Sequence, residues 1–311
     1  MTTVPGTRYR VYSQYLKNKY GETVYKLPIN LPGTCPNRDG IKGKGGCIFC
    51  DEQGAGFDAL SPVLTVEEQL ARNKDYSRRR FGARKFISYF QSYSNTYLPV
   101  EQFRENLLKA WGEDMVGISV STRPDCITQG HLDALEEIRE TKGADIDVEL
   151  GLQTVNYRTL EKINRGHTLG EFVDAANRVK GRGFNLCVHM ILNLPGDEIT
   201  DVIEGAKVLS AFQVDYVKLH SLYIVEGTKL GELYRSGEIS VCSFGEYVER
   251  VAAFIRYLRP DTVIQRLAAK GPKGKVLFCN WGLDYREVLQ AVESFLEEKD
   301  IRQGTDFTYL S

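Results

Sequence analysis

The stretch TCPNRDGIKGKGGCIFC, from Thr34 to Cys50, follows a short predicted strand at 23–27 and precedes a long series of alternating apolar and amphipathic segments. Its cysteines, Cys35, Cys47 and Cys50, have the spacing C-x11-C-x2-C. Three thiolates on a glycine-rich loop can bind one soft metal centre and leave a coordination position for a ligand that is not protein. Structural zinc normally takes four protein ligands, and the loop has no further Cys or His. The stretch favours an iron-sulfur cluster, while zinc completed from elsewhere in the chain and a chance spacing stay open.

Strand and helix patterns alternate on both sides of this loop. The strand candidates are Thr23–Leu27, Lys85–Phe90, Val116–Ser121, Ile146–Leu152, Leu186–Leu192 and Tyr216–Leu222. The helix candidates are Val66–Arg80, Val100–Trp111, Gly130–Lys142, Gly170–Arg182 and Glu198–Phe212. This alternation predicts parallel β/α units, and six such units fall short of the eight in a closed TIM barrel. The predicted fold class is therefore α/β, a partial (β/α)6 TIM-type barrel with a C-terminal α/β extension.

The predicted division of the chain is a barrel over 1–239 and an extension over 240–311 that packs on it. The barrel part includes an N-terminal extension and the cysteine loop at 31–62. The extension contains a helix pattern at 244–257, a strand pattern at 262–267 and a second helix pattern at 285–299. No linker composition separates the two parts.

The amino-acid composition excludes several classes of protein. The 311 residues contain 40 Lys+Arg and 41 Asp+Glu, a net charge of -1, which excludes a uniformly basic nucleic-acid coat but allows a local basic patch. Without a signal-peptide core or an 18-residue apolar stretch, a cytoplasmic protein with no membrane partner is expected. The odd number of cysteines, seven, then favours ligands or buried thiols over disulfides. The roles of Cys126, Cys187, Cys242 and Cys279 stay open.

One face of the predicted strands is repeatedly polar. Successive residues of a strand point to opposite faces, so residues two apart share a face. The residues on the polar face are Ser119, Ser121, Arg123, Glu149, Gly151, Gln153, Cys187, His189, Asn193, Lys218 and His220. The other face is apolar and suits a cover of helices. A polar barrel interior indicates a bound occupant, the alternative being polar groups that simply satisfy one another at strand ends.

Further motifs accompany the cysteine loop. They are STRPDC (121–126), ELGLQTVNYRTLEKINRGHT (149–168), CVHMILNLPGDE (187–198) and VKLHSLYIVEGTKL (217–230). With these motifs, the chain from about Tyr9 to Ile239 resembles the radical SAM superfamily, and within it the Elongator catalytic subunit and a group of shorter bacterial homologues. The first cysteine gap is longer than the superfamily's usual C-x3-C-x2-C, and an expanded gap also occurs in Elongator-like members.

The resemblance implies two cofactors. Cys35, Cys47 and Cys50 would bind a 4Fe-4S cluster whose unique iron binds the amino and carboxylate groups of S-adenosylmethionine, which is then cleaved to a 5'-deoxyadenosyl radical. The implied S-adenosylmethionine-binding residues are Phe49, Gln91, Ser121, Gln153, Arg165 and His189. Phe49 is expected near the adenine, and the Arg165 guanidinium suits a carboxylate. The residues also allow Phe49 in the core, Arg165 as a helix cap and His189 as a satisfied interior histidine.

The resemblance also suggests a substrate. It implies tRNA, with removal of the carboxymethyl unit of 5-carboxymethylaminomethyl-2-thiouridine at the wobble position to give 5-aminomethyl-2-thiouridine. The candidate catalytic residues are Arg123, Lys218, His220 and Tyr223. A reducing partner such as flavodoxin or ferredoxin is expected. Because the sequence ends about 70 residues after the barrel, the acetyltransferase chemistry of Elongator is not expected.

Two other functions fit parts of the sequence. One is a radical SAM enzyme that acts on a peptide or a small metabolite, and the other is a non-enzymatic zinc-binding module. Basic clusters could contact tRNA phosphates, or could be ordinary solvated surface. These clusters are Arg78–Arg80 with Arg84 and Lys85, Lys42 with Lys44, and Lys270 with Lys273 and Lys275.

Overall fold

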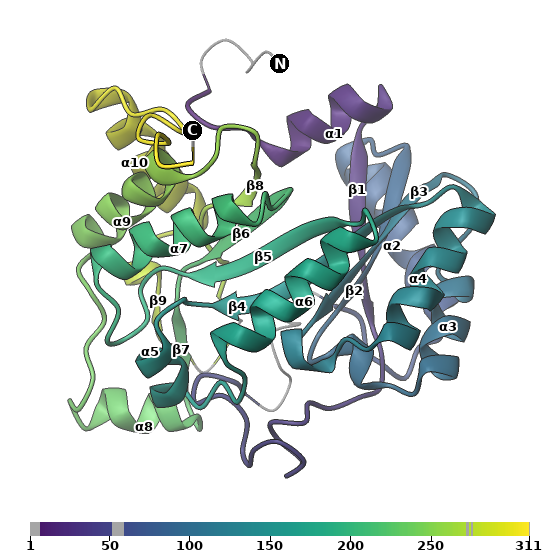
Figure 1. Ribbon diagram of the computed structural model, residues 1–311, viewed down its shortest axis with the longest axis horizontal. Coiled ribbons are helices and arrows are strands. Elements are labelled where there is room, and N and C mark those ends of the chain that lie inside the picture. The colour runs from purple at the N-terminus through teal and green to yellow at the C-terminus, as the bar shows by residue number, and fades with distance from the viewer. Residues whose placement is uncertain (1–6, 52–58, 272–273, 275, 311) are drawn as a thin grey trace.

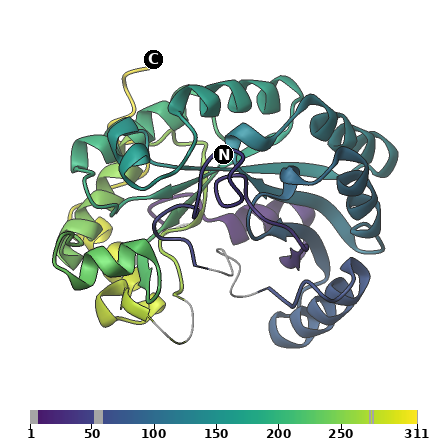
Figure 2. The same cartoon turned by 90° about the horizontal axis from the view of Figure 1, so that it is seen from below.

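The computed structural model describes residues 7–51, 59–271, 274 and 276–310, in which parallel strands form one curled sheet (Figure 1). The strand order is β1-β2-β3-β4-β5-β6-β8. The bounds are β1 Val24–Asn30, β2 Lys85–Gln91, β3 Met115–Thr122, β4 Asp145–Gln153, β5 Asn185–Ile191, β6 Tyr216–His220 and β8 Val263–Arg266. From one end the sheet is an arch with helices along its outer side and an open inner side (Figure 2). The structure is the predicted partial barrel.

The outer face of the sheet is apolar and lies under helices. These helices are α2 Val66–Phe81, α3 Val100–Lys109, α4 Gln129–Lys142, α6 Leu169–Gly181, α7 Ile199–Ala211 and α9 Phe244–Tyr257. Strand residues such as Phe86, Val148 and Leu219 are completely buried beneath them. Burial of these side chains is the main favourable contribution to the free energy of folding. No helix in the described ranges is long and apolar enough to cross a membrane.

Several helices begin at a capping box. At Thr65, Thr168 and Ser243 the side chain accepts a hydrogen bond from the backbone three residues later, where a Glu side chain bonds back. Each box satisfies two backbone donors that a helix start leaves without partners. The cap at Thr168 also fixes where the chain turns after the NRGH segment, which carries Arg165 into the barrel.

The sheet has one strand more than the six that the repeat pattern predicts. The strand predicted at 262–267 in the C-terminal extension is β8, which pairs in parallel with β6. The remaining elements are α5 Tyr157–Lys162, α8 Lys229–Arg235, α10 Tyr285–Glu298, a hairpin of β7 Tyr223–Val225 with β9 Val276–Cys279, and single helical turns at Asn95–Tyr97, Pro124–Cys126 and Asn280–Gly282. The C-terminal extension therefore completes the sheet rather than only packing on it.

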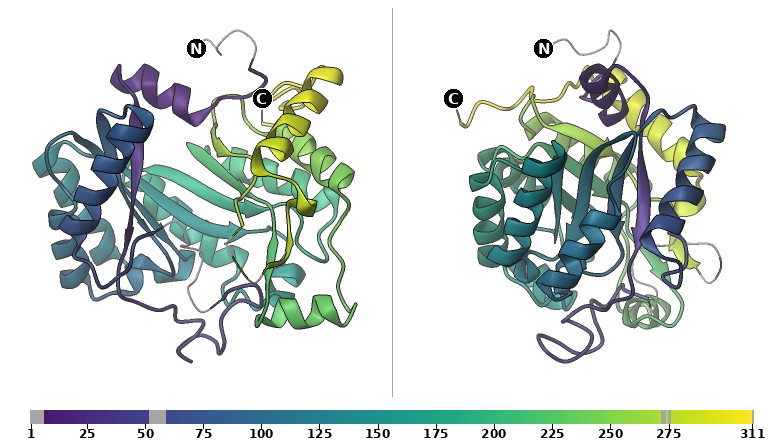
Figure 3. Two further views of the ribbon diagram at one scale, coloured as in Figure 1. Left: turned by 180° about the vertical axis from the view of Figure 1, so that it is seen from behind. Right: turned by 90° about the vertical axis from the view of Figure 1, so that its right-hand side faces the viewer.

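Helix α1 (Tyr12–Tyr20) closes the amino-terminal end of the barrel. It lies across that end of the sheet, while the cysteine loop and α8 lie at the opposite end (Figure 3). Tyr12 and Leu16 are buried against inward-facing residues such as Cys187 and Tyr216. The rings of Tyr12 and Tyr216 meet edge to face, with centroids 5.3 Å apart. A half-barrel cannot fill its own interior, so this helix seals one end and leaves the other for a ligand.

Replacing Leu16 with Ala should lower the free energy of unfolding by about 2–4 kcal/mol, because the change leaves a cavity in a buried apolar cluster. Chemical denaturation followed by circular dichroism measures this. The matched control is Lys17→Ala on the exposed side of the same helix, for which a change below about 0.5 kcal/mol is expected. Equal effects of the two changes would show that α1 does not seal the barrel.

Candidate active site

A cavity of about 460 Å³ lies at the carboxyl ends of the strands. This is where parallel β/α barrels carry their active sites, because the strand ends and the loops after them converge there. The cysteine loop lines one part of its wall, and polar residues at the ends of β2 to β6 and β8 line the rest. The strand register brings these residues together: Ser121 lies opposite Glu149, Gly151 opposite His189, and His189 opposite Lys218.

The cysteine loop is held by backbone hydrogen bonds rather than by regular secondary structure. Ile48 N donates to the carbonyl of Ile163 at 3.0 Å, and Leu230 N donates to the carbonyl of Ile48 at 2.8 Å. Cys50 N donates to the carbonyl of Cys47 at 2.9 Å, so these two cysteines share one tight turn. The loop is thereby fixed between the end of α5 and the start of α8.

Asn37, which the sequence patterns did not single out, is the buried anchor of the loop. Its side chain is completely buried, and Nδ2 donates to the carbonyl of Asn164 at 2.6 Å. A Cβ at Gly43 would lie 2.2 Å from Asn37 Oδ1, and one at Gly166, where φ is +73°, would lie 2.4 Å from it. Both glycines are therefore required by the close approach of this amide.

The geometry of the three cysteines separates the two metal hypotheses. Four-coordinate zinc with Zn–S bonds of about 2.3 Å would hold its sulfurs about 3.8 Å apart. Among the described residues, three Cys, His, Asp or Glu ligand atoms lie within 4.8 Å of one another at one place, which is formed by Glu149, Cys187 and His189. The sulfurs of the three loop cysteines are therefore not all within 4.8 Å of one another. A four-iron cluster binds each cysteine to a separate iron and so needs a wider spacing. The loop fits the cluster better than it fits a single zinc ion.

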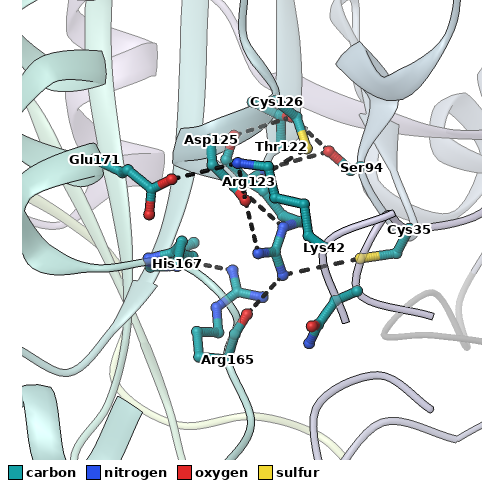
Figure 4. Close-up of polar contacts among 12 residues, drawn as sticks. Cys35, Lys42, Ser94, Thr122, Arg123, Asp125, Cys126, Arg165, His167 and Glu171 are labelled. Atoms are coloured by element: carbon teal, nitrogen blue, oxygen red, sulfur yellow. Dashed lines mark hydrogen bonds and ion pairs between the residues drawn. The ribbon is translucent and has the colours of Figure 1, made fainter. Parts of the chain in front are cut away.

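Two arginines lie close to the cysteine sulfurs, and Figure 4 shows the contact between Arg123 and Cys35. Arg123 Nη1 is 3.9 Å from Cys35 Sγ, and Arg165 Nη1 is 3.5 Å from Cys47 Sγ. Burial and the neighbouring Cys47 raise the pKa of the Cys50 thiol to about 12, while Arg165 and Arg38 lower it. The thiol is therefore protonated without a metal, and a bound metal would favour the thiolate.

Arg123 is locked by an ion pair. Its guanidinium is 2% exposed and forms two hydrogen bonds with Asp125, at 2.8 and 2.9 Å. Nη1 also donates to the carbonyl of Arg165 at 2.8 Å, and Lys42 lies 3.2 Å from the Asp125 carboxylate. These contacts place Arg123 as a support between the loop and the strand ends.

Arg165 is held by the end of β4. Its Nη2 donates to the carbonyl of Gly151 at 2.6 Å, and a Cβ at Gly151 would lie 2.7 Å from that nitrogen. His167 Nε2 lies 3.0 Å from the same carbonyl, and burial with the nearby arginines lowers the pKa of His167 to about 3. Gln153 follows at a β-bulge with φ of +79°, a strained conformation of the kind found where structure fixes a functional side chain.

Glu149 is the centre of the barrel interior. Its fully buried carboxylate contacts Lys26 Nζ and Lys218 Nζ, both at 2.5 Å, and His189 Nε2 at 2.6 Å. Ser119 Oγ donates to it at 2.9 Å. Burial alone would raise the pKa of Glu149, but Lys218, Lys26 and His189 hold it well below its usual value of 4.5. Because these two ammonium groups already compensate the carboxylate, its grouping with Cys187 and His189 does not indicate a metal site.

The same buried environment lowers the pKa values of three basic side chains that line the cavity. Burial and repulsion from Lys218 lower the pKa of His189 to about 4, so it is neutral at pH 7. Burial, Arg266 and His189 hold the pKa of His220 well below its usual range. Burial also lowers the pKa of Lys218, whose Nζ donates to Tyr89 at 3.0 Å.

All of the site residues predicted from the sequence line this one cavity. They are Cys35, Cys47, Phe49, Cys50, Gln91, Ser121, Arg123, Gln153, Arg165, His189, Lys218, His220 and Tyr223. Asn193, predicted on the same face, is buried and accepts a hydrogen bond from Leu222 N. The sequence patterns missed Lys26 and Arg266, although each is a cation in a strand pattern. Their individual roles stay predictions.

The sequence matches cover the residues that build this cavity. A model described as the Radical SAM superfamily matches residues 30–209, and one described as the Radical_SAM C-terminal domain matches residues 214–298. The uncharacterized protein YtqA of Bacillus subtilis is 33% identical over 304 residues, which are 97% of this chain and 94% of YtqA. Elongator complex protein 3 of Homo sapiens is 29% identical over 181 residues, which are 56% of this chain and 30% of that protein.

A solved structure has the same fold. Elp3 of the archaeon Methanocaldococcus infernus aligns with a TM-score of 0.68 and 17% identity, over 90% of this chain and 64% of that chain. At this identity the likeness supports the fold alone.

Replacing Glu149 with Gln should lower the free energy of unfolding by about 3–5 kcal/mol at pH 7, because it leaves two buried ammonium groups without their shared carboxylate. Since the folded-state pKa is below the unfolded value, this stabilisation is present above about pH 4.5 and is lost as the pH falls further. The difference between the two proteins should therefore shrink below pH 4.5 in urea denaturation.

The matched control is Asp145→Asn on the same strand. Asp145 pairs with Lys19, and both side chains are about one-third exposed, so a loss below about 1 kcal/mol is expected. A pH-independent effect of Glu149→Gln would contradict the assignment of Glu149 as an ionised interior carboxylate.

Proposed function

The chain belongs to the radical SAM superfamily and is a radical SAM enzyme, and on this premise we propose that it removes the carboxymethyl unit from 5-carboxymethylaminomethyl-2-thiouridine at the wobble position of tRNA. The product would be 5-aminomethyl-2-thiouridine: the methylene of the carboxymethyl unit would lose a hydrogen atom to the 5'-deoxyadenosyl radical and one electron to the oxidised cluster, and water would hydrolyse the resulting imine to release the two carbons as glyoxylate. The main support is one cavity that joins a three-cysteine loop to a polar barrel interior. The sequence similarity to Elongator complex protein 3 supports tRNA as the substrate class.

Radical SAM enzymes use a 4Fe-4S cluster and S-adenosylmethionine, which together supply a 5'-deoxyadenosyl radical for hydrogen abstraction. Cys35, Cys47 and Cys50 would hold the cluster. Arg165 Nε is buried and has no hydrogen-bond partner within the described ranges, which fits an added carboxylate. The residues proposed to bind S-adenosylmethionine with Arg165 are Phe49, Gln91, Ser121, Gln153 and His189. A one-electron donor such as flavodoxin or ferredoxin is part of this proposal.

Residues of the chain form the floor of the cavity and are placed to hold a substrate near the cofactor. Tyr89, Lys218 and Glu149 form a continuous hydrogen-bonded floor that fixes the cavity's depth. His220 stays neutral, and because Arg266 donates to its acceptor nitrogen, the ring N–H can donate a hydrogen bond to a substrate group. Lys218, His220 and Tyr223 are proposed to position the substrate so that one C–H bond faces the cofactor. Arg123, the fourth predicted catalytic residue, is proposed to act indirectly, because Asp125 and the Arg165 carbonyl hold it beside Cys35.

The predicted basic clusters differ in how well each could contact tRNA phosphates. Arg78, Arg79 and Arg84 pair with Asp114, Asp75 and Glu22. They lie at the end of α2 that meets the start of β2, away from the cavity. Lys42 is engaged by Asp125 and Glu171. Lys270 lines the cavity and is exposed, whereas Lys273 and Lys275 lie outside the described residues. Lys270 is thus the best supported phosphate contact.

The observations bear differently on the two alternative functions, a zinc-binding module and a radical SAM enzyme with another substrate. The family match is at odds with a non-enzymatic zinc-binding module, and so is the cysteine spacing. A peptide or a small metabolite as substrate remains an outcome of the experiment that follows.

The proposed reaction is tested anaerobically with reconstituted protein, S-adenosylmethionine, reductant and tRNA that carries the carboxymethylaminomethyl nucleoside. Mass spectrometry of the digested nucleosides should show its loss and the appearance of the aminomethyl form. Cys47→Ala should abolish the 4Fe-4S absorption and the reaction, because it removes a cluster ligand. Cys242→Ala, which changes a cysteine outside the cavity lining, should retain both.

Three results would contradict parts of the proposal. Formation of 5'-deoxyadenosine with unchanged nucleosides would reject the substrate and keep the radical chemistry. Retained cluster absorption in Cys47→Ala would reject the ligand assignment. Loss of the cluster in Cys242→Ala would show that the loop is not its sole source of cysteine ligands.

A further inference from the structure

Arg266, at the end of β8, is a cation of the cavity without an acidic partner. Its Nη2 lies 2.6 Å from His220 Nδ1 and 2.9 Å from Nε2 of the same ring. Its Nε is buried and has no hydrogen-bond partner in the described part of the chain. No carboxylate of the described residues forms an ion pair with it. A guanidinium placed in this way is costly unless an anion joins it.

The other cationic groups of the cavity are already engaged. Arg123 pairs with Asp125, and Arg165 bonds the Gly151 carbonyl beside Cys47. Arg38 donates to the carbonyl of Asp51. Arg266 differs from these three arginines in that its hydrogen-bond contacts within the described residues are all with one neutral imidazole, that of His220.

The buried interior supplies no spare negative charge. The ammonium groups of Lys26 and Lys218 are balanced by the carboxylates of Glu149 and Asp147. His220 cannot compensate Arg266, because a protonated imidazole would add a second positive charge beside it. The region around Arg266 thus carries one net positive charge that faces the cavity.

Arg266 and Arg165 lie at different strands of the sheet. Arg165 contacts the end of β4, whereas Arg266 ends β8, which is three strands away in the order β4-β5-β6-β8. At about 4.8 Å per strand, this is about 14 Å along the curled sheet. The backbone segments next to the two guanidinium groups are therefore well separated, and the experiment below follows the affinity for S-adenosylmethionine and the affinity for RNA separately.

We propose that Arg266 binds the carboxylate of the substrate. This inference rests on the proposed function, in which the group to be removed is a carboxymethylamine. The carboxylate would accept a paired hydrogen bond from the guanidinium, and this would place the adjacent methylene inside the cavity. The methionine carboxylate of S-adenosylmethionine is assigned to the Arg165 end.

The test uses reconstituted holoprotein with S-adenosylmethionine and two anticodon stem-loop RNAs that differ in one group. One carries the carboxymethylaminomethyl nucleoside and the other the aminomethyl nucleoside. The wild type should bind the first RNA at least tenfold more tightly. Arg266→Gln should lose this preference through about tenfold to hundredfold weaker binding of the first RNA, the range expected for a charge-assisted hydrogen bond. Arg266→Lys, which keeps the charge but not the paired geometry, should retain part of the preference.

The matched control is Arg104→Gln, which removes a guanidinium that pairs with Glu137 on the outer helices and should leave the preference unchanged. Cluster absorption and melting temperature verify that each variant is folded. Affinity for S-adenosylmethionine is measured in parallel. A loss of that affinity in Arg266→Gln as large as the loss for RNA would overturn the proposal, because Arg266 would then hold the cofactor's carboxylate. A full preference in Arg266→Gln would overturn it as well.

A small probe separates this inference from the proposed function. N-ethylglycine contains the amine and carboxylate of the modification without the nucleoside. It should raise the melting temperature of the wild-type holoprotein and of Arg104→Gln, and not that of Arg266→Gln. If the probe behaves in this way but the two RNAs bind equally, the proposed tRNA substrate is wrong and the anion site stands. If the probe has no effect on the wild type, the anion site is wrong.

Discussion

The buried carboxylate of Glu149 determines how the rest of the barrel interior is built. A closed barrel fills its interior with layers of apolar side chains, but an open half-barrel leaves its inner face without a partner. Here, one carboxylate on β4 draws in a lysine from β1, a serine from β3, a histidine from β5 and a lysine from β6. These contacts connect five strands at one level along the barrel axis. Above this level the strand ends are free to line a cavity, and below it α1 seals the barrel.

The cysteine loop depends on a different constraint, the close approach of backbone to buried side chains. At 31–51, the part of the loop that holds the cysteines, there is no regular helix, and the order of this part comes from the Asn37 amide and from backbone bonds to neighbouring segments. Arg123 and Arg165 then connect the sulfurs to the ends of β3 and β4. A position that is set by packing and hydrogen bonds in this way can hold a metal cluster without a fourth protein ligand.

Local patterns predicted much of this arrangement. The alternation of polar and apolar residues correctly gave the six repeated strands and the inward face of Glu149, His189 and Lys218, because a strand's period of two is a local property. The addition of β8 to the sheet was not predicted, since pairing between β6 and a distant segment is a long-range event. Asn37 and Lys26 were missed for the same reason: their partners are 127 and 123 residues away.

Charge divides the cavity into two functional ends. At the cysteine end, Arg123 and Arg165 face sulfurs that become anionic when they bind metal. The positive charges of these two arginines are then compensated by the thiolates. In the middle, Glu149 neutralises Lys218 and keeps the floor rigid without attracting an anion. At the β8 end, the neutral His220 leaves the charge of Arg266 uncompensated. A ligand that is cationic or apolar toward β8 would leave that charge buried without a partner, whereas a carboxylate satisfies it. On the proposed role of Arg266, the electrostatic balance that stabilises the barrel interior would also favour an anionic substrate group.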